Sequence, residues 1–285
     1  MATHPLAEAA LRPIGDAATS PNAIRAWKPA LPGVREVLHA RFHDHDYPRH
    51  THDDWTVFIV DDGVIHYGLD RHERVATGSM VGLLPPNVVH DGRVGAADGY
   101  RKRVLYVDTD VLPESLVGAA VDRSSIDDAE FVGEIAAIHD ALACPEDALE
   151  AETRFALATE RIRSWLGRPD PPPPPGSNRV VAEAVRAVLD ARLVEPLTLA
   201  EVAAQAGWSP AHAARAFSEV FGISPHAYLL GRRLDAARDR ILAGQPLADV
   251  AVATGFFDQP HLTRHFRRFL GATPAGFRSG VRMAT

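Results

Sequence analysis

The chain has 285 residues, a formal net charge of −7 and a single cysteine. This length accommodates two domains, and a lone cysteine excludes a disulfide within the chain. No apolar stretch reaches the roughly 18 residues that span a bilayer, and no hydrophobic leader follows a charged start. The sequence therefore predicts a cytoplasmic protein with no membrane partner.

The charge is distributed unevenly along the chain. Residues 178–285 contain 13 Arg and 9 acidic residues, a net charge of +4, whereas residues 1–177 carry a net charge of −11. The overall acidity would argue against nucleic-acid binding, but attraction to phosphate is a property of the docking surface alone. The C-terminal third is therefore the part expected to approach nucleic acid.

The N-terminal part is predicted to be rich in strands. Residues 1–20 form no clear element and are expected to be a mobile arm or a frayed end. Residues 21–110 contain short apolar runs, and Asp61-Asp62-Gly63 between two of them is a hairpin signal. Such spacing predicts a barrel or sandwich, with strands over 55–60, 64–69, 79–84 and 103–107.

A histidine pattern in this region resembles the two motifs of the cupin fold, a jelly-roll barrel whose mouth holds a ligand or a metal. The pattern is His50-Thr-His52 with Gly63, followed by Gly78, Pro85-Pro86-Asn87 and His90. The resemblance implies a small-molecule effector site in the barrel, formed by His50, His52, Trp55 and His90.

The same resemblance raises the question of a divalent metal held by His50, His52 and His90. A metal-binding cupin adds a glutamate to its histidines, and its place here falls near Thr56 or Val57, so this carboxylate is missing. Two interpretations stay open. Either the three histidines bind a metal, with Asp53 or Asp54 in place of the glutamate, or they contact a ligand or make structural hydrogen bonds without one; no cofactor is certain.

Residues 111–168 are predicted to contain two helices. Phe131, Ile135, Ile138 and Leu142 recur at helical spacing, and a second helix follows Pro145. Their apolar faces need a cover, which is either a second copy of the chain in a homodimer or the barrel itself. Residues 169–178, with five consecutive prolines, are predicted to be an extended, semi-rigid linker.

A segment of about fifty residues occurs twice after this linker. Residues 199–208 return as 247–256, and Phe217 returns as Phe266, with an offset of 48 that becomes 49 after Gly255. Each copy predicts a short helix, a glycine turn at Gly207 or Gly255, and a capped second helix. A long helix from Pro225 to about residue 243 is expected to connect the two helix-turn-helix units.

These repeats resemble the DNA-binding domain of the AraC/XylS family of bacterial transcription regulators. The resemblance is carried by Gly207-Trp-Ser-Pro210, Gly222-Ile-Ser-Pro225, residues 255–266 and Gly271-Ala-Thr-Pro274. The resulting fold class is multidomain α and β: a cupin-like β-barrel with trailing helices, then an all-α double helix-turn-helix domain over residues 179–285. The resemblance implies double-stranded DNA as a partner, and RNA polymerase is a further candidate.

The DNA contacts are assigned from the face opposite Phe217 and Phe266 and from the resemblance. Base contacts are expected from Ala211, Ala214 and Arg215 in the first unit and from Gln259, His261 and Arg264 in the second. Arg pairs with guanine, Gln with adenine, and an Ala methyl contacts thymine. Ser218, Arg267 and Arg268 are expected to contact the DNA backbone.

Three functions remain open at this stage. The first is a non-enzymatic transcription regulator that is controlled by a small-molecule effector, acting as activator or repressor. The second is a metal-dependent cupin enzyme fused to a DNA-binding domain, which the missing glutamate disfavours. The third is a DNA-binding protein whose barrel is only a dimerisation scaffold.

Overall fold

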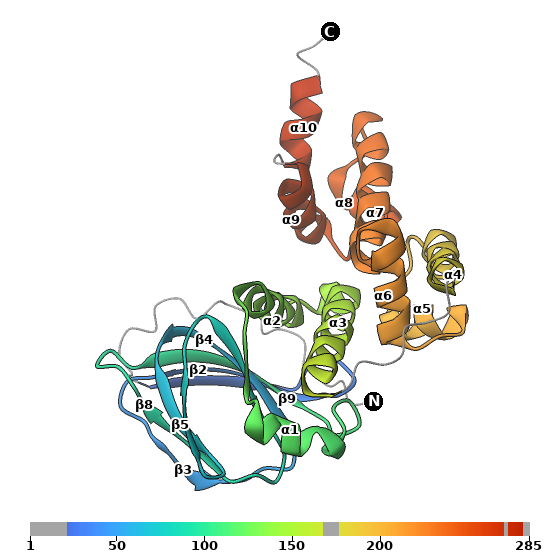
Figure 1. Ribbon diagram of the computed structural model, residues 1–285. Helices are drawn as coiled ribbons and strands as arrows, with labels where there is room; N and C mark the ends of the chain where they lie inside the picture. The colour runs from blue at the N-terminus through green and yellow to red at the C-terminus, as the bar shows by residue number, and fades with distance from the viewer. Residues whose placement is uncertain (1–21, 168–176, 271–272, 282–285) are drawn as a thin grey trace, which may run out of the picture. The chain divides into compact units, whose positions relative to one another are not determined.

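The computed structural model describes residues 22–167, 177–270 and 273–281 (Figure 1). Contacts divide the chain into two compact units, Met1–Cys144 and Pro145–Thr285, which we call the N-terminal and C-terminal units. The predicted arm, most of the predicted proline linker and Gly271 lie outside the described residues. The division by contacts falls before the proline segment, because the helix that precedes this segment packs with helices that follow it.

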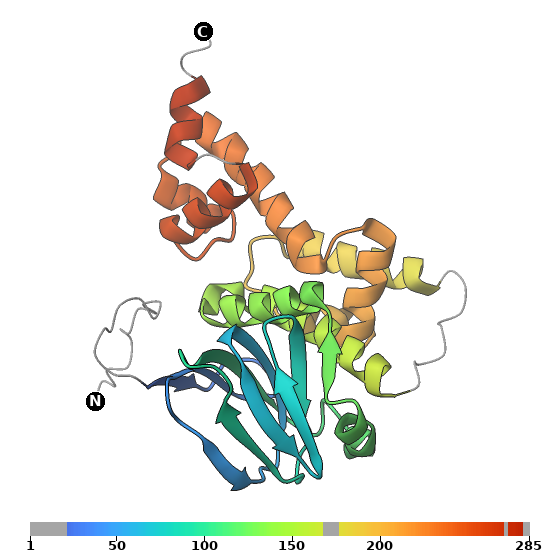
Figure 2. The same ribbon diagram turned by 60° about the vertical axis from the view of Figure 1, so that its left-hand side comes forward.

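The N-terminal unit consists of two antiparallel sheets, which confirms the predicted β-rich domain (Figure 2). The six-stranded sheet has the order β1 (Ala23–Trp27), β2 (Val34–Phe42), β9 (Tyr100–Val107), β4 (Trp55–Gly63), β7 (Met80–Leu84) and β10 (Ser125–Asp127). The four-stranded sheet has the order β3 (Tyr47–His50), β8 (His90–Val94), β5 (Ile65–Leu69) and β6 (His72–Ala76).

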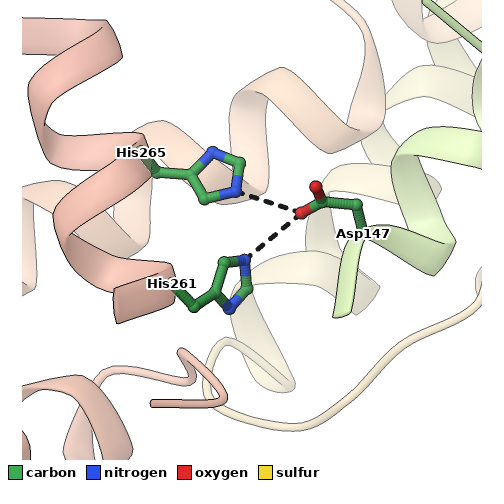
Figure 3. A group of neighbouring side chains, drawn as sticks. All are labelled: Asp147, His261 and His265. Carbon is green, nitrogen blue, oxygen red and sulfur yellow. Dashed lines mark hydrogen bonds and ion pairs between the residues drawn. The ribbon is translucent and has the colours of Figure 1, made fainter. Parts of the chain in front are cut away.

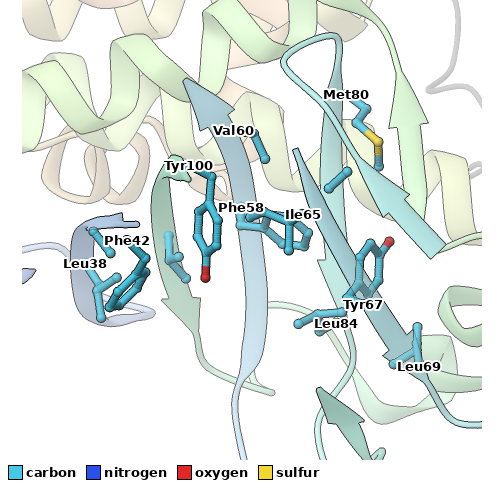
Figure 4. Packing of buried hydrophobic residues seen from close by; sticks show 13 residues of the cluster. Leu38, Phe42, Phe58, Val60, Ile65, Tyr67, Leu69, Met80, Leu84 and Tyr100 are labelled. Carbon is cyan, nitrogen blue, oxygen red and sulfur yellow. The ribbon is translucent and has the colours of Figure 1, made fainter. Parts of the chain in front are cut away.

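The core of this unit contains apolar side chains from both sheets (Figure 4). On β9, Tyr100 and Val104 belong to this core, and strand alternation places Lys102 on the same inner face. On β4 all of residues 55–60 are buried, because both faces of this central strand are covered. On each strand, the alternation of side chains therefore decides which residues face the space between the two sheets.

Helices complete the N-terminal unit. The 3₁₀ turn η1 (Glu114–Leu116) and α1 (Val117–Asp122) precede α2 (Ala129–Leu142), which packs against β4 and β7. The predicted apolar stripe of α2, Phe131, Ile135 and Ile138, is almost completely buried within this chain. This stripe is therefore covered without a second copy.

The C-terminal unit is helical. Its elements are η2 (Pro145–Asp147), α3 (Ala148–Leu166), α4 (Ser177–Ala191), α5 (Leu199–Ala206), α6 (Pro210–Phe221), α7 (Pro225–Leu242), α8 (Leu247–Ala253), α9 (Gln259–Leu270) and α10 (Pro274–Val281). One apolar cluster joins α4, α5 and α6 with Leu149 of α3 and Leu229 of α7. A second cluster joins α8 and α9 with the other half of α7, so this long helix connects two cores (Figure 1).

Local sequence signals set the helix ends as predicted. Thr198 and Glu201 form a capping box at α5, whereas Pro246 gives α8 no side-chain cap. Gly207 and Gly255 have φ of 83° and 81°, which is the left-handed region where glycine is favoured. The structure therefore confirms two helix-turn-helix units, α5–α6 and α8–α9.

Candidate nucleic-acid interface and effector cavity

The second helix of each unit, α6 and α9, presents the predicted DNA contacts, and we call these the reading helices. Phe217 of α6 and Phe266 of α9 are completely buried and fix the rotation of each helix. Ser209 accepts a hydrogen bond from the His212 N–H at the start of α6, and Asp258 accepts one from the His261 N–H at the start of α9. Both helices therefore begin at a defined residue with a defined orientation.

An open groove runs along the exposed face of α9. Its lining residues are polar or basic, with the exception of one proline: Gln259, Pro260, Thr263, Arg264, Arg267, Arg268 and Thr273. Gln259, Thr263 and Arg267 follow one another at intervals of four residues and share one side of the helix. Sequence reasoning missed Thr263, which the same four-residue spacing from Gln259 would have found.

Two predicted base-contacting residues do not lie on an open face. Ala214 is completely buried and belongs to the apolar cluster that includes Leu149 of α3. His261 is 6% exposed, and its ring is directed at Asp147 in η2. η2 and α3, which the helix wheel did not include, cover this side of α6 and α9 in this fold, so the base contacts of Ala214 and His261 stay predictions.

The two predicted base-reading arginines lie beside carboxylates. Arg215 Nη1 is 2.5 Å from Glu160 Oε1, and Arg264 Nη2 is 2.8 Å from Asp147 Oδ2. Ala211 is only half-buried on α6, and the Ser218 hydroxyl donates to the carbonyl oxygen of Ala214. Arg267 and Arg268 of α9 are exposed.

Asp147 is the centre of the contacts on α9 (Figure 3). Its Oδ1 accepts hydrogen bonds from Nε2 of His261, at 3.2 Å, and from Nε2 of His265, at 3.0 Å. Burial alone would raise the pKa of Asp147, but these two hydrogen bonds and the charge of Arg264 outweigh it and hold the pKa well below its usual range. Asp147 is therefore a charged carboxylate in a nearly closed site.

Asp147, His261 and His265 have a spacing that invites a metal assignment, but the hydrogen bonds disfavour it. His261 Nδ1 accepts the backbone N–H of Phe257 at 3.1 Å, so the hydrogen of this ring sits on Nε2 and points at Asp147. A metal-bound histidine instead donates its second N–H to an acceptor. The triad therefore fits a hydrogen-bonded carboxylate better than a metal site.

His226 of α7 gives a prediction for pH. Burial lowers its pKa to about 4, so the ring is neutral in the fold while the unfolded chain takes up a proton near pH 6.5. Stability therefore falls as the pH drops from about 6.5 toward 4, by up to ~3 kcal/mol for this residue. Urea unfolding at a series of pH values should show a shallower loss for His226→Gln than for wild type, and equal slopes would contradict the assignment.

The second candidate site is a cavity of about 60 Å³ inside the N-terminal unit. The rings of His50 and His90 are 4.4 Å apart between centroids, and those of His52 and His90 are 4.7 Å apart. The Nδ1–H of each ring donates to a backbone carbonyl: His50 to that of Pro48, His52 to that of Asp54 and His90 to that of Val88. The structure therefore brings the three predicted histidines together at this cavity.

Trp55 does not line the cavity. It is completely buried, whereas the cavity wall on β4 consists of Thr56 and Phe58. Successive side chains of a strand point to opposite faces of the sheet, so a shift of one residue moves the contact to the other side. The assignment of Trp55 to the effector site was therefore wrong.

Lys102 on β9 also lines the cavity and was missed by sequence reasoning. Its Nζ lies 4.3 Å from the ring centroid of Tyr47, a cation–π contact, and burial lowers its pKa to about 8. Among the described residues, no carboxylate lies within ion-pair distance of Nζ. The alternation Tyr100, Lys102, Val104, Tyr106 was a signal in the sequence that places this lysine inside.

The cavity does not suit a divalent metal. His52 Nε2 accepts the Thr56 hydroxyl at 2.9 Å, and the carboxylate among the lining residues, Asp91, accepts the backbone N–H of Gly68 at 2.9 Å. The charge of Lys102 also lowers the pKa of His90, after burial and the neighbouring histidines, and the same charge repels a cation. The donors and the positive charge fit an anion better.

The two parts of the chain each match a family model. A β-rich domain with a cavity is followed along the chain by two helix-turn-helix units. The AraC-like ligand binding domain matches residues 32–158, and a helix-turn-helix domain matches residues 202–280. The chain belongs to the AraC family of transcription regulators.

Two curated relatives match the chain over different lengths. The chain is 37% identical over 91 residues to the Right origin-binding protein of Escherichia coli strain K12, covering 32% of each chain. It spans about a third of the length of such relatives. It is 25% identical to the HTH-type regulator YbfI of Bacillus subtilis strain 168, over 76% of this chain and 81% of that one.

Among solved structures, the DNA-binding domain of AdpA in complex with a target DNA is 30% identical. The match covers 36% of this chain and 94% of that one, with a TM-score of 0.33. In the part of the chain that the structure describes, none of the helices is both long and apolar enough to cross a membrane.

Proposed function

We propose that the chain binds specific sequences of double-stranded DNA through α6 and α9 and that a small molecule in the cavity controls this binding. The observation that carries the proposal is the duplicated helix-turn-helix with the basic, open face of α9. Both reading helices then enter successive major grooves on one side of the duplex, about one helical turn apart.

The roles within the interface follow from exposure and chemistry. Arg215 and Arg264 are the guanine contacts and Gln259 the adenine contact, while Ala211 offers a methyl group to thymine. Arg267, Arg268 and Ser218 hold the sugar–phosphate backbone and set the position of the protein on the DNA. The buried Ala214 and His261 take part only if η2 and α3 move away.

The effector is a small organic anion. The Lys102 ammonium group is half-buried and forms no ion pair with a carboxylate of the described residues, so a ligand carboxylate would neutralise it. Three imidazoles and the hydroxyl groups of Tyr47, Tyr100 and Tyr106 surround the cavity, so further hydrogen bonds are available to the same ligand. The volume of about 60 Å³ limits the ligand to a compact molecule.

The test of DNA binding is selection from a pool of random-sequence duplexes with the full-length protein. Enrichment of one motif with two blocks about ten base pairs apart is the expected result. A folded protein that enriches no motif would overturn the proposal.

Control by an effector implies different affinities for two states of the protein. An anion that shifts DNA binding must bind one of these states more tightly, so it changes both thermal stability and DNA affinity. The scaffold alternative expects neither change. The enzyme alternative is not favoured, because the cavity offers no complete metal set and Lys102 opposes a cation.

The family resemblance also implies partners and a location for the chain. We include in the proposal that the chain forms a homodimer, contacts RNA polymerase and lies in the cytoplasm. Sedimentation of the full-length protein distinguishes a dimer from a monomer.

A further inference from the structure

Three carboxylates of one segment lie on the DNA-reading side of the C-terminal unit. We call residues 146–160 the acidic segment, since Glu146, Asp147 and Glu160 contact the reading helices. We propose that the acidic segment occupies the DNA-reading faces of α6 and α9 and competes with DNA for Arg215 and Arg264. This inference rests on the proposed DNA binding and adds its regulation.

The first observation is the equivalence of the two contacts. Arg215 and Arg264 are separated by 49 residues, the repeat offset of the second helices, so they occupy the same position in the two helix-turn-helix copies. Glu160 binds the first arginine at 2.5 Å, and Asp147 binds the second at 2.8 Å. One short segment therefore contacts the matching position in both readers.

The second observation is the extent of the cover. The Asp147 side chain is 9% exposed, and its two oxygens bind three polar side chains of α9, those of His261, Arg264 and His265. Glu146 adds a further contact to Arg264 at 3.5 Å. In the first helix-turn-helix copy, Ala214 of α6 is buried in a cluster with Leu149, Ala156 and Leu157 of α3. Both reading faces are thus partly covered.

The chemistry makes the two partners exclusive. A guanidinium donates the same N–H groups to a carboxylate, to a phosphate or to guanine O6 and N7. An arginine that donates these N–H groups to Glu160 or Asp147 must release the carboxylate before the same groups can contact a base. DNA binding therefore carries the cost of displacing the acidic segment. The measured affinity equals the intrinsic affinity multiplied by the fraction of molecules in which the reading helices are free.

The competing interpretation is that these are ordinary ion pairs within one fold. Exposed ion pairs contribute little, so a purely structural role predicts no effect on DNA affinity beyond the change in net charge. The two interpretations are separated by comparing variants of equal charge. Asp235 and Glu195 provide the control, because their contacts are to Arg238 and Arg192, away from the reading helices.

The experiment uses the full-length protein and the duplex that it enriches from the random pool. Affinity for this duplex and for an unselected duplex is measured for wild type, for Asp147→Asn/Glu160→Gln and for the control Asp235→Asn/Glu195→Gln. The first variant should bind the enriched duplex about tenfold more tightly than the control, within the range of ordinary coupling between sites. The single change Glu160→Gln should show part of this gain and does not depend on the buried Asp147.

Each other outcome is decisive. Equal affinities for the two double variants, or no gain for Glu160→Gln alone, would overturn the competition and leave a structural ion pair. Failure of wild type and all variants to bind any duplex would instead overturn the proposed DNA binding. A gain of equal size on the unselected duplex would also contradict the inference, because it would show a general charge effect.

Discussion

Arg215→Ala and Arg264→Ala should each weaken binding to the enriched duplex by ~1–3 kcal/mol and relax the preference at separate base positions. Each change removes one bidentate donor from one reading helix, so each should affect one block of the motif. Affinity is measured on the enriched duplex and on duplexes with single base changes in either block.

Arg268→Ala is the matched control for this prediction, since Arg268 is an exposed arginine on α9 assigned to the DNA backbone. It should weaken the enriched and unselected duplexes alike and reduce the salt dependence by about one charge. If Arg215→Ala also caused equal loss on both duplexes, Arg215 would be a backbone contact.

Lys102→Met should remove the response of the full-length protein to small organic anions. The probes are acetate, propionate and benzoate, each compared with its neutral amide. Wild type should be stabilised against heat by at least one carboxylate and not by its amide, by about 3 kcal/mol at a hundredfold excess over Kd. The variant keeps an unbranched side chain of similar size and loses the ammonium group that the carboxylate would neutralise.

Lys28→Met is the control, because Lys28 is the other lysine of the chain and is exposed. It should respond as wild type does. Lys102→Met also loses the cation–π contact with Tyr47, so its stability without a probe is measured as the reference for its response. Stabilisation of Lys102→Met by the same carboxylate would contradict the assignment of the anion to this lysine.

Local signals were enough to predict much of the fold. The glycines at positive φ, the capping box at Thr198 and the repeat offset define helix ends through contacts within a few residues. The strands on either side of residues 61–63 were predicted for the same reason, but the predicted hairpin was wrong. Residues 61–63 belong to β4, and β4 and β5 lie in different sheets, so the turn signal was correct for the chain reversal and not for the strand pairing. β1 and β3 were not predicted individually because they are short and partly exposed. β2 has nine residues, but its register shifts between Val34 and Glu36, which interrupts the alternation of its side chains.

The candidate sites depended on contacts between distant residues. Trp55 and Thr56 differ by one position, and only the pairing of β4 in the sheet decides which of them faces the cavity. Likewise, a helical wheel places His261 on the outer side of α9, but Asp147 lies 114 residues earlier and covers it. Neither relation can be obtained from the local pattern.

The most direct test of the central claim is guanine N7 methylation protection on the enriched duplex with the full-length protein. The account predicts two protected blocks in the major groove, about ten base pairs apart on one side of the duplex, with Arg215→Ala and Arg264→Ala each removing protection from a different block. Protection of a single block that both variants weaken equally, or no protection in the major groove, would contradict it.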